Sequence, residues 1–303
     1  MIELMLYLYA ESPLHPGGAE SVDALDLPVQ REVTTGYPVI WGQSLKGALR
    51  QAAGRDPLVT AVFGSGIEED VQKPTSAGLL AVGDAQLVAM PVPTLQHTFA
   101  WATSALALSR LRRRYLALAP NPGEPEQSPP HAPVMPGVPV VPVDAAVAAH
   151  AGWLTPQPAR HAFGPCLVEL PDNTPSEELV GWANQIATHA LDGPDGPLGF
   201  FARKLTEDLI LFGDDVMTTL LTECTEFVAR VQLNDGKTVQ NGPFYSEYLP
   251  AETILVASLS LRESADQERH LGLLRRLLHN QLIRIGGDET IGKGLVWTRL
   301  VEA

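Results

Sequence analysis

Residues 15–50 bring several chemically active side chains into one short stretch. The stretch holds a histidine, two glycines, an isolated aspartate and two cations, which are His15, Gly17, Gly18, Asp26, Lys46 and Arg50. Lys46 and Arg50 lie four residues apart, so on a helix they share one face and can point outward together. Cations and an open backbone suit the binding of nucleic-acid phosphates, and a carboxylate beside them can hold a divalent ion near a scissile phosphate.

Two of these residues also fit simpler roles. Asp26 lies between two leucines and is followed by Pro28 after one residue, a pattern that equally fits a capping or turn aspartate. His15 can serve as a general acid or base, or it can be an ordinary polar residue of a loop. Spacing alone favours the structural role for both residues.

A glycine-rich loop near the C-terminus, residues 285–294, looks like a phosphate-binding loop. Gly287 to Lys293 follows the pattern G-x-x-x-x-G-K, but the next residue is Gly294, where a serine or threonine would hold magnesium. A strand follows instead of a helix, so the pattern excludes a nucleotide triphosphatase. The loop can still bring backbone N–H groups close to a phosphate, or form only a tight turn. The candidate residues are Gly286, Gly287, Gly292, Lys293 and Gly294.

Residues 234–255 combine turn residues, a cation and aromatic side chains. Lys237, Phe244 and Tyr248 could stack on bases or wedge between nucleotides, or the two aromatic residues could pack on the core.

The elements that position these residues follow from the hydrophobic pattern. We expect strands over 2–11, 227–233, 252–260 and 295–301, and a strand, turn and strand over 78–91. Helices are expected over 42–53, 97–118, 175–192, 200–222 and 264–284. Asp235-Gly236 indicates a long hairpin. Nine prolines in residues 119–142 indicate an exposed loop. The order strand, helix, strand, strand, helix, strand, with large insertions, predicts a ferredoxin-like α+β core.

Composition narrows the class of protein. The chain has 303 residues and a formal net charge of −14, which taken alone argues against nucleic acid. The charge is uneven, because residues 85–123 contain no acid but carry arginines at 110 and 112–114, either a solvated helix face or a binding surface. Two cysteines predict neither a disulfide framework nor a zinc site. No apolar run could span a bilayer, so we expect no membrane partner. The two cysteines fit reduced thiols, so we expect a cytoplasmic location.

The ordered motifs HPGG, DLPVQRE, GQSLKGALR, FAWATS, NGPFYSEYLP and GGDETIGKG resemble the RAMP superfamily. DLPVQRE together with FYSEYLP is most similar to the backbone subunit of the type III-B CRISPR (Cmr) effector complex. This resemblance implies a modified ferredoxin-like (RRM-like) palm in a single domain of residues 1–303. It also implies a proline-rich insertion at about 119–146, a projecting hairpin thumb at about 232–251 and the loop at 286–294.

The resemblance also implies a function. Copies of the chain would stack along a crRNA with other Cmr subunits, and the thumb would wedge into the guide–target duplex. Target RNA would be cut at regular intervals by attack of its own 2′-hydroxyl, with Asp26 coordinating Mg²⁺ and Lys46 and Tyr248 assisting. The implied RNA-binding residues are His15, Gly17, Gly18, Arg31, Ser44, Lys46, Arg50, Lys237, Phe244 and the five residues of the final loop.

The chain departs from the resemblance at three places. Pro93-Thr94 stands where many relatives have Arg-Ser, His97 stands where glycine is common, and Ser246 stands where an acid often precedes Glu247. Ser246 and the altered turn keep open a structural RAMP subunit that does not cut RNA. A second alternative is the backbone subunit of the related type III-A (Csm) complex, against which DLPVQRE argues.

Overall fold

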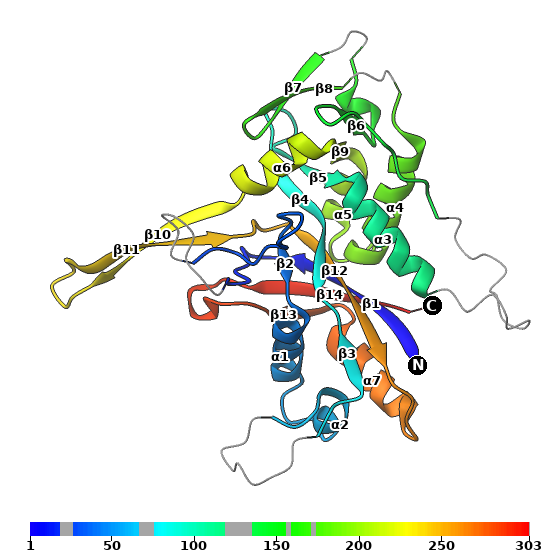
Figure 1. The fold of residues 1–303 in the computed structure, drawn as a ribbon, viewed down its shortest axis with the longest axis vertical. Helices are drawn as coiled ribbons and strands as arrows, with labels where there is room; N and C mark the ends of the chain where they lie inside the picture. The colour runs from blue at the N-terminus through cyan, green and yellow to red at the C-terminus, as the bar shows by residue number, and fades with distance from the viewer. Residues whose placement is uncertain (19–26, 67–75, 119–134, 156–158, 171–173, 303) are drawn as a thin grey trace, which may run out of the picture.

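The computed structural model describes residues 1–18, 27–66, 76–118, 135–155, 159–170 and 174–302. Its largest feature is a ten-stranded mixed sheet with the strand order β13-β14-β1-β12-β4-β5-β9-β6; β2 pairs with β4 and β3 with β12. Figure 1 shows this sheet running through the centre of the molecule, with helices on both sides and one hairpin projecting away from it.

Four antiparallel strands in the order β14-β1-β12-β4 form the palm. With two helices, they follow the chain order and spatial order of a ferredoxin-like fold, so the predicted α+β fold is confirmed. The palm comprises β1 (Ile2–Ala10), α1 (Gly42–Ala53), β4 (Ala85–Pro93), β12 (Ile254–Leu261), α7 (Gln267–Leu278) and β14 (Leu295–Glu302). Three short strands extend it, β2 (Val39–Ile40), β3 (Leu80–Val82) and β13 (Gln281–Arg284), and α2 (Val59–Phe63) follows α1.

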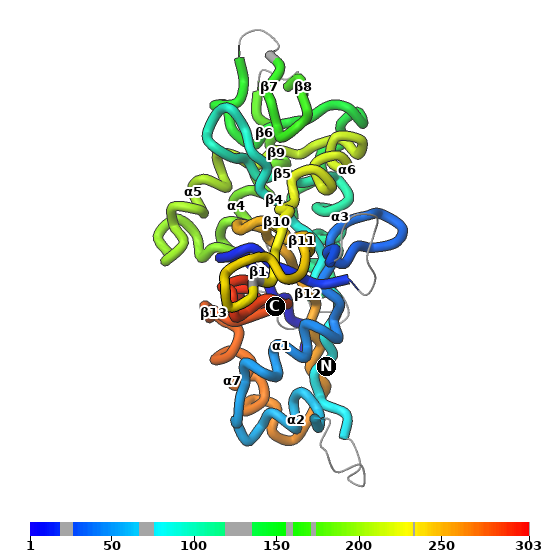
Figure 2. Tube along the Cα trace, turned by 90° about the vertical axis from the view of Figure 1, so that its left-hand side faces the viewer, coloured from blue at the N-terminus to red at the C-terminus, as the bar shows by residue number. Residues whose placement is uncertain are grey.

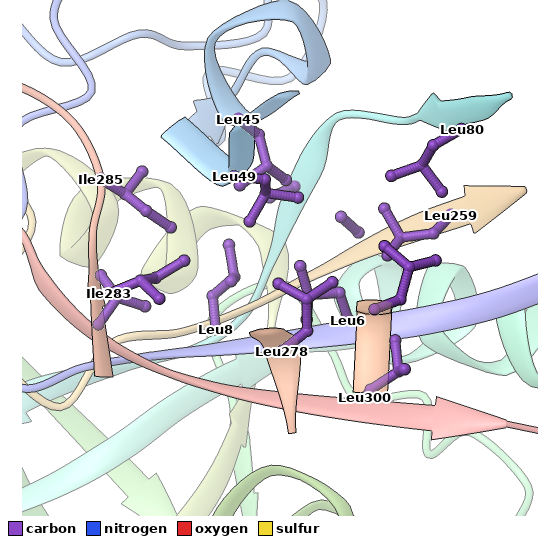
Figure 3. Packing of buried hydrophobic residues seen from close by; sticks show 14 of the residues in the cluster. Leu6, Leu8, Leu45, Leu49, Leu80, Leu259, Leu278, Ile283, Ile285 and Leu300 are labelled. Carbon is purple, nitrogen blue, oxygen red and sulfur yellow. The ribbon is translucent and has the colours of Figure 1, made fainter. Parts of the chain in front are cut away.

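β1 is buried on both faces because helices cover both sides of the sheet. Leu6 and Leu8 point to one side and pack with Leu45 and Leu49 of α1 and Leu278 of α7 (Figure 3). The alternate residues of β1 pack with helices of the inserted region on the opposite side. The aliphatic positions four apart in α1 therefore fix its inner face, and this leaves its polar face outside.

A large insertion between β4 and β12 builds the upper part of the molecule in Figure 1. It contains β5 (Phe99–Ser104), α3 (Ala105–Leu118), β6 (Ala146–Ala148), β7 (Ala159–Phe163), β8 (Cys166–Leu170), α4 (Glu177–Leu191), α5 (Gly199–Asp208), β9 (Leu209–Phe212) and α6 (Asp214–Glu223). Residues 119–134 of the proline-rich segment lie outside the described residues. Cys166 and Cys224 are both free thiols.

The predicted hairpin consists of β10 (Glu226–Leu233) and β11 (Val239–Tyr248). Figures 1 and 2 show it leaving the palm from the side on which β13 and β14 lie. The hairpin therefore runs from Glu226 to Tyr248. Both of its ends lie earlier in the sequence than those of the expected range, 232–251. Among the described residues, no helix combines the length and apolar character needed to span a bilayer.

Three predicted helices were wrong in part, because each contains a strand. Phe99–Ser104, expected in a helix over 97–118, pairs with β4 and β9, since its aromatic and β-branched residues fit a sheet buried on both faces. Leu209–Phe212 interrupts the helix expected over 200–222, because four consecutive apolar residues there form a fully buried strand. The helix expected over 264–284 ends at Leu278; Asn280 adopts a left-handed φ of 56°, and β13 follows.

Candidate nucleic-acid interface

The glycine-rich loop fits against the segment that contains His15. The amide of Gly287 donates to the carbonyl of His15 at 3.0 Å, and the amide of Gly294 donates to the carbonyl of Pro13 at 3.0 Å. Gly286 has a φ of 89°, and a Cβ there would lie 2.5 Å from the His15 carbonyl oxygen. The close approach of the two segments therefore requires glycine. Two motifs that are about 270 residues apart in sequence thus form one surface.

Tyr248 lies between these segments and is buried. Its hydroxyl donates to Asp288 Oδ2 at 2.7 Å, the Lys293 ammonium lies 4.8 Å from its ring centroid, and the His15 ring lies 5.4 Å away. Burial raises the pKa of Tyr248, so the hydroxyl stays protonated at neutral pH. Burial acts to raise the pKa of Asp288 too, but hydrogen bonds from Tyr248 and Arg230 outweigh it, and the net shift is downward.

Arg230 ties the hairpin to the glycine-rich loop. Its guanidinium donates to Asp288 Oδ1 at 2.7 Å and to Ser246 Oγ at 2.9 Å. The serine that stands where an acid is common is therefore engaged in the same network. Sequence reasoning missed Asp288 and Arg230. Asp288 lies within the GGDET motif, where the glycines and Lys293 drew attention, and nothing in the sequence pairs it with Arg230.

Glu247 holds the segment that follows Asp26. Its buried carboxylate accepts from the amide of Val29 at 2.9 Å and forms an ion pair with Arg31 at 2.6 Å. Its carbonyl oxygen bonds to His15 Nδ1 at 2.7 Å. Asp26 itself lies outside the described residues.

Leu27, the next residue along the chain from Asp26, is fixed to the hairpin by main-chain bonds. Its amide donates to the carbonyl of Tyr245 at 3.1 Å, and its carbonyl accepts from the amide of Glu247 at 2.9 Å. The segment that leaves Asp26 is therefore attached to β11 close to the palm.

A hollow of about 440 Å³ lies at this attachment. The register of the two hairpin strands shifts between Arg230 and Gln232 at this point. The lining is mainly apolar, and Phe244 is 37% exposed. The hollow is lined by Leu27, Arg230, Val231, Gln232 and Phe244. An exposed aromatic ring beside an arginine suits stacking on a nucleobase.

The α1 residues lie elsewhere on the palm. Ser44 is exposed, and the Lys46 ammonium donates to the carbonyl of Leu80 at 2.7 Å. Burial and then the nearby Arg262 lower the pKa of Lys46. Leu80 pairs with Leu261, at the opposite end of the central strands from Tyr248. The structure does not bring Lys46 and Tyr248 together, because roughly 25 Å of strand separates these two ends.

The remaining predicted residues take several positions. A Cβ on Gly17 would lie 2.9 Å from His15 Nε2, and the amide of Gly18 donates to the carbonyl of Pro28 at 2.7 Å. Lys237 lies exposed in the turn of the hairpin, away from the palm, with a φ of 56°. Gly292 has a φ of 82°, and nothing lies near its missing side chain.

The arginine cluster of α3 divides into two parts. Arg110 pairs with Glu32 at 2.9 Å, and Arg114 bonds to Ser258 and to Gln86. Arg114 therefore ties α3 to the sheet and Arg110 ties it to the loop that contains Glu32, whereas Arg112 and Arg113 are exposed.

Metal ligands do not gather in the part of the chain that the structure describes. No group of three or more histidine, cysteine, aspartate or glutamate side chains there could hold a metal ion. Two acids near the hairpin base, Glu247 and Asp288, are committed to Arg31 and Arg230.

Comparisons with known proteins agree on one family. The family model described as RAMP superfamily matches residues 7–297. The CRISPR system Cmr endoribonuclease Cmr4 of Pyrococcus furiosus is 30% identical, over 97% of this chain and 94% of the relative. A crystal structure of oligomeric Cmr4 from the same organism superposes with a TM-score of 0.69 at 26% identity, covering 100% of this chain and 99% of that one. A cryo-EM structure of type III-B Cmr-beta bound to cognate target RNA contains a chain with the same fold, with a TM-score of 0.70 at 20% identity over 99% of this chain and 97% of that one.

Proposed function

This chain belongs to the RAMP superfamily and, within it, to the Cmr4 family, and from that premise we propose that it is the crRNA-binding, target-RNA-cleaving backbone subunit of a type III-B CRISPR Cmr complex. The observation that carries the proposal is the attachment of the segment after Asp26 to the base of the projecting hairpin. Leu27 and Val29 are both bonded to the hairpin strand that contains Glu247. A hairpin that enters a duplex would therefore present RNA to Asp26.

The proposed reaction uses a nucleophile that RNA itself supplies. The 2′-hydroxyl of the target attacks the adjacent phosphorus, the bond to the 5′-oxygen of the next nucleotide breaks, and the products are a 2′,3′-cyclic phosphate and a 5′-hydroxyl. The attack requires the 2′-oxygen, phosphorus and leaving oxygen to lie in line. Phe244 and the hollow beside Leu27 would hold a displaced nucleotide, and Asp26 would act at the scissile phosphate.

Tyr248 has a more indirect role in this account. Its hydroxyl donates to Asp288, and Asp288 pairs with Arg230. The tyrosine therefore positions the glycine-rich loop relative to the hairpin. The loop, with Lys293, would bind guide phosphates through backbone N–H groups and one ammonium.

Mg²⁺ remains part of the proposal with Asp26 as its protein ligand. Glu247 and Asp288 are each engaged in an ion pair, so neither offers a second free carboxylate. One carboxylate together with substrate phosphate oxygens is a common arrangement for Mg²⁺ in proteins. The ion would neutralise negative charge at the scissile phosphate.

The proposed partners are a crRNA, a complementary target RNA, further copies of this chain and other Cmr subunits. A Cmr4 relative has been crystallised as an oligomer. The attachment of the segment after Asp26 to a hairpin that projects from its own palm fits a site that acts on RNA held by neighbouring copies.

Cleavage by the assembled complex tests the proposal. A guide-matched, end-labelled target RNA should yield products at regular intervals with Mg²⁺, and EDTA should abolish them while target binding persists. Target binding without any cleavage would favour a structural subunit instead, and cleavage that persists in EDTA would remove the metal from the account.

A further inference from the structure

Gln30 is a buried glutamine whose four polar groups are all hydrogen-bonded to other parts of the chain; it is 7% exposed. Its side-chain amide donates to the carbonyl of Gly17 at 2.8 Å, and its side-chain oxygen accepts from the amide of Trp41 at 3.2 Å. Its main-chain amide donates to the carbonyl of Pro16 at 2.7 Å, and its main-chain carbonyl accepts from the amide of Val39 at 3.0 Å. Because a buried amide that loses its partners is costly, these bonds fix three stretches of chain relative to one another.

Two of these stretches flank the segment that contains Asp26. Gly17 and Val29 form an isolated antiparallel β-bridge, and the amide of Gly18 donates to the carbonyl of Pro28 at 2.7 Å. Residues 16–18 and 28–30, here called the stem, therefore hold both ends of that segment together. The glutamine side chain adds a bond across the stem, from one of its strands to the other.

The third stretch is the start of α1, which lies in the rigid part of the palm. Trp41 is the N-cap residue of α1, and its carbonyl accepts from the amide of Leu45 at 2.9 Å. The next amide, that of Gly42, donates to Asp84 Oδ1 at 2.7 Å. Leu45 is fully buried in the palm core, where close packing leaves little room for movement. The bond from Gln30 to Trp41 therefore ties the stem to a fixed point of the fold.

The stem is thus held from two sides. Glu247 holds it from the hairpin, because its carboxylate accepts from the amide of Val29 at 2.9 Å. Gln30 holds it from the palm through Trp41. A segment attached at both places keeps its position when either neighbouring element moves slightly.

We propose that Gln30 is a positioning residue for RNA cleavage, which keeps Asp26 at the scissile phosphate by fixing the stem to α1. The inference rests on the proposed function and adds to it a residue that acts through Asp26. The in-line attack requires close control of geometry, and a displacement of about 1 Å can lower a rate about 100-fold. The loss of one bond from the stem is therefore expected to affect the cleavage step far more than the affinity for target RNA.

Single-turnover cleavage and target binding by the complete complex, measured separately, test this role. Gln30→Met keeps the volume of the side chain but cannot donate to Gly17 and accepts only weakly from Trp41. We expect the cleavage rate to fall about 10- to 100-fold while the Kd for target RNA changes by less than about twofold.

The matched control is Gln185→Met, the same change at another partly buried glutamine. Gln185 lies on α4 in the insertion and donates to Met135 Sδ at 3.5 Å. This variant should cleave at the rate of the parent. Melting temperatures of both variants check that they fold.

A double variant distinguishes a positioning role from a general loosening of the protein. If Gln30 acts through Asp26, adding Gln30→Met to Asp26→Asn should lower the residual cleavage rate by less than about twofold, because the group that it positions is already lost. Losses that multiply in the double variant would overturn the inference. An equal fall in target affinity and cleavage rate in Gln30→Met would also overturn it, because the residue would then serve binding.

Unchanged cleavage by the Gln30→Met complex would overturn the positioning role and leave the proposed function intact, and so would an equal loss in Gln185→Met. If Gln30→Met does not fold, Gln30→Glu takes its place. An ionised glutamate keeps the acceptor for Trp41 and loses the donor to Gly17, so the same separation of rate from affinity is expected. Failure of the unaltered complex to cleave would overturn the proposed function and this inference together.

Discussion

Glu247 is the residue through which the hairpin controls the segment after Asp26. Its carboxylate accepts a hydrogen bond from the amide of Val29 and forms an ion pair with Arg31. Its backbone is hydrogen-bonded to Leu27 and to the His15 ring. A carboxylate used in this way cannot also act as a free metal ligand or proton acceptor, so its role is to position the neighbouring chain. The same holds for Asp288, which links Tyr248 to Arg230.

Glu252 gives a prediction at the residue scale. It is buried enough to raise its pKa to about 7, and its Oε2 is buried without a hydrogen-bond partner. The folded state therefore binds a proton more tightly than the unfolded state, and stability falls as pH rises from about 4.5 to about 7. Glu252→Gln removes this loss, so the variant should be more stable than the parent at pH 8 by about 1–2 kcal/mol, after allowing for partial exposure.

Urea unfolding at pH 5 and pH 8 measures that difference. The control is Glu223→Gln, because Glu223 is exposed at the end of α6. The advantage of Glu252→Gln should shrink at pH 5. A variant that is less stable than the parent at pH 8 would show that the carboxylate is charged and useful in the fold.

The sequence predicted helices and strands well where the hydrophobic residues followed a single period, either helical or extended. The leucines of α1 repeat at helical spacing, and the helix was predicted with the bounds that the structure has. The strands Leu209–Phe212 and Gln281–Arg284 were hidden because each adjoins a helix and is short, so a continuous apolar pattern ran through both. Their partners in the sheet are distant in sequence, and local pattern carries no information about them.

Local sequence pattern also failed to predict the contacts of the candidate site that join residues distant in the chain. The glycines and His15 stood out by residue type, whereas Arg230 and Asp288 became meaningful only when folding brought them to 2.7 Å. Lys46 and Tyr248 were grouped by family resemblance, and the fold separates them.

The glycine-rich loop gives a prediction at the element scale. Gly286 and Gly292 both have a positive φ, but only a Cβ on Gly286 would meet backbone, the His15 carbonyl oxygen at 2.5 Å. Alanine at either position carries the left-handed penalty of about 1–2 kcal/mol. Gly286→Ala adds a clash and should therefore be less stable than Gly292→Ala by about 1–3 kcal/mol in urea unfolding. Equal stability of the two variants would contradict the close packing of the loop on the His15 segment.

The whole molecule combines a ferredoxin-like palm with a large insertion that covers its second face. The order of elements in the sequence predicted the palm. It did not predict the fold of the insertion, because the strands of the insertion join the same sheet out of sequence order. The net charge of −14 does not exclude RNA binding in this account, because cations are concentrated locally: Lys46 and Arg262 both donate to backbone carbonyls within residues 78–80. Net charge does not describe the local field of such a surface.

Guide-directed cleavage by the complete complex reconstituted with Asp26→Asn is the most direct test of the central claim. Asp23→Asn is the matched control, because Asp23 lies three residues away in the same segment. We predict that Asp26→Asn lowers the cleavage rate at least about 100-fold while assembly and target binding are retained, and that Asp23→Asn cleaves normally. Full cleavage by the Asp26→Asn complex would contradict the account.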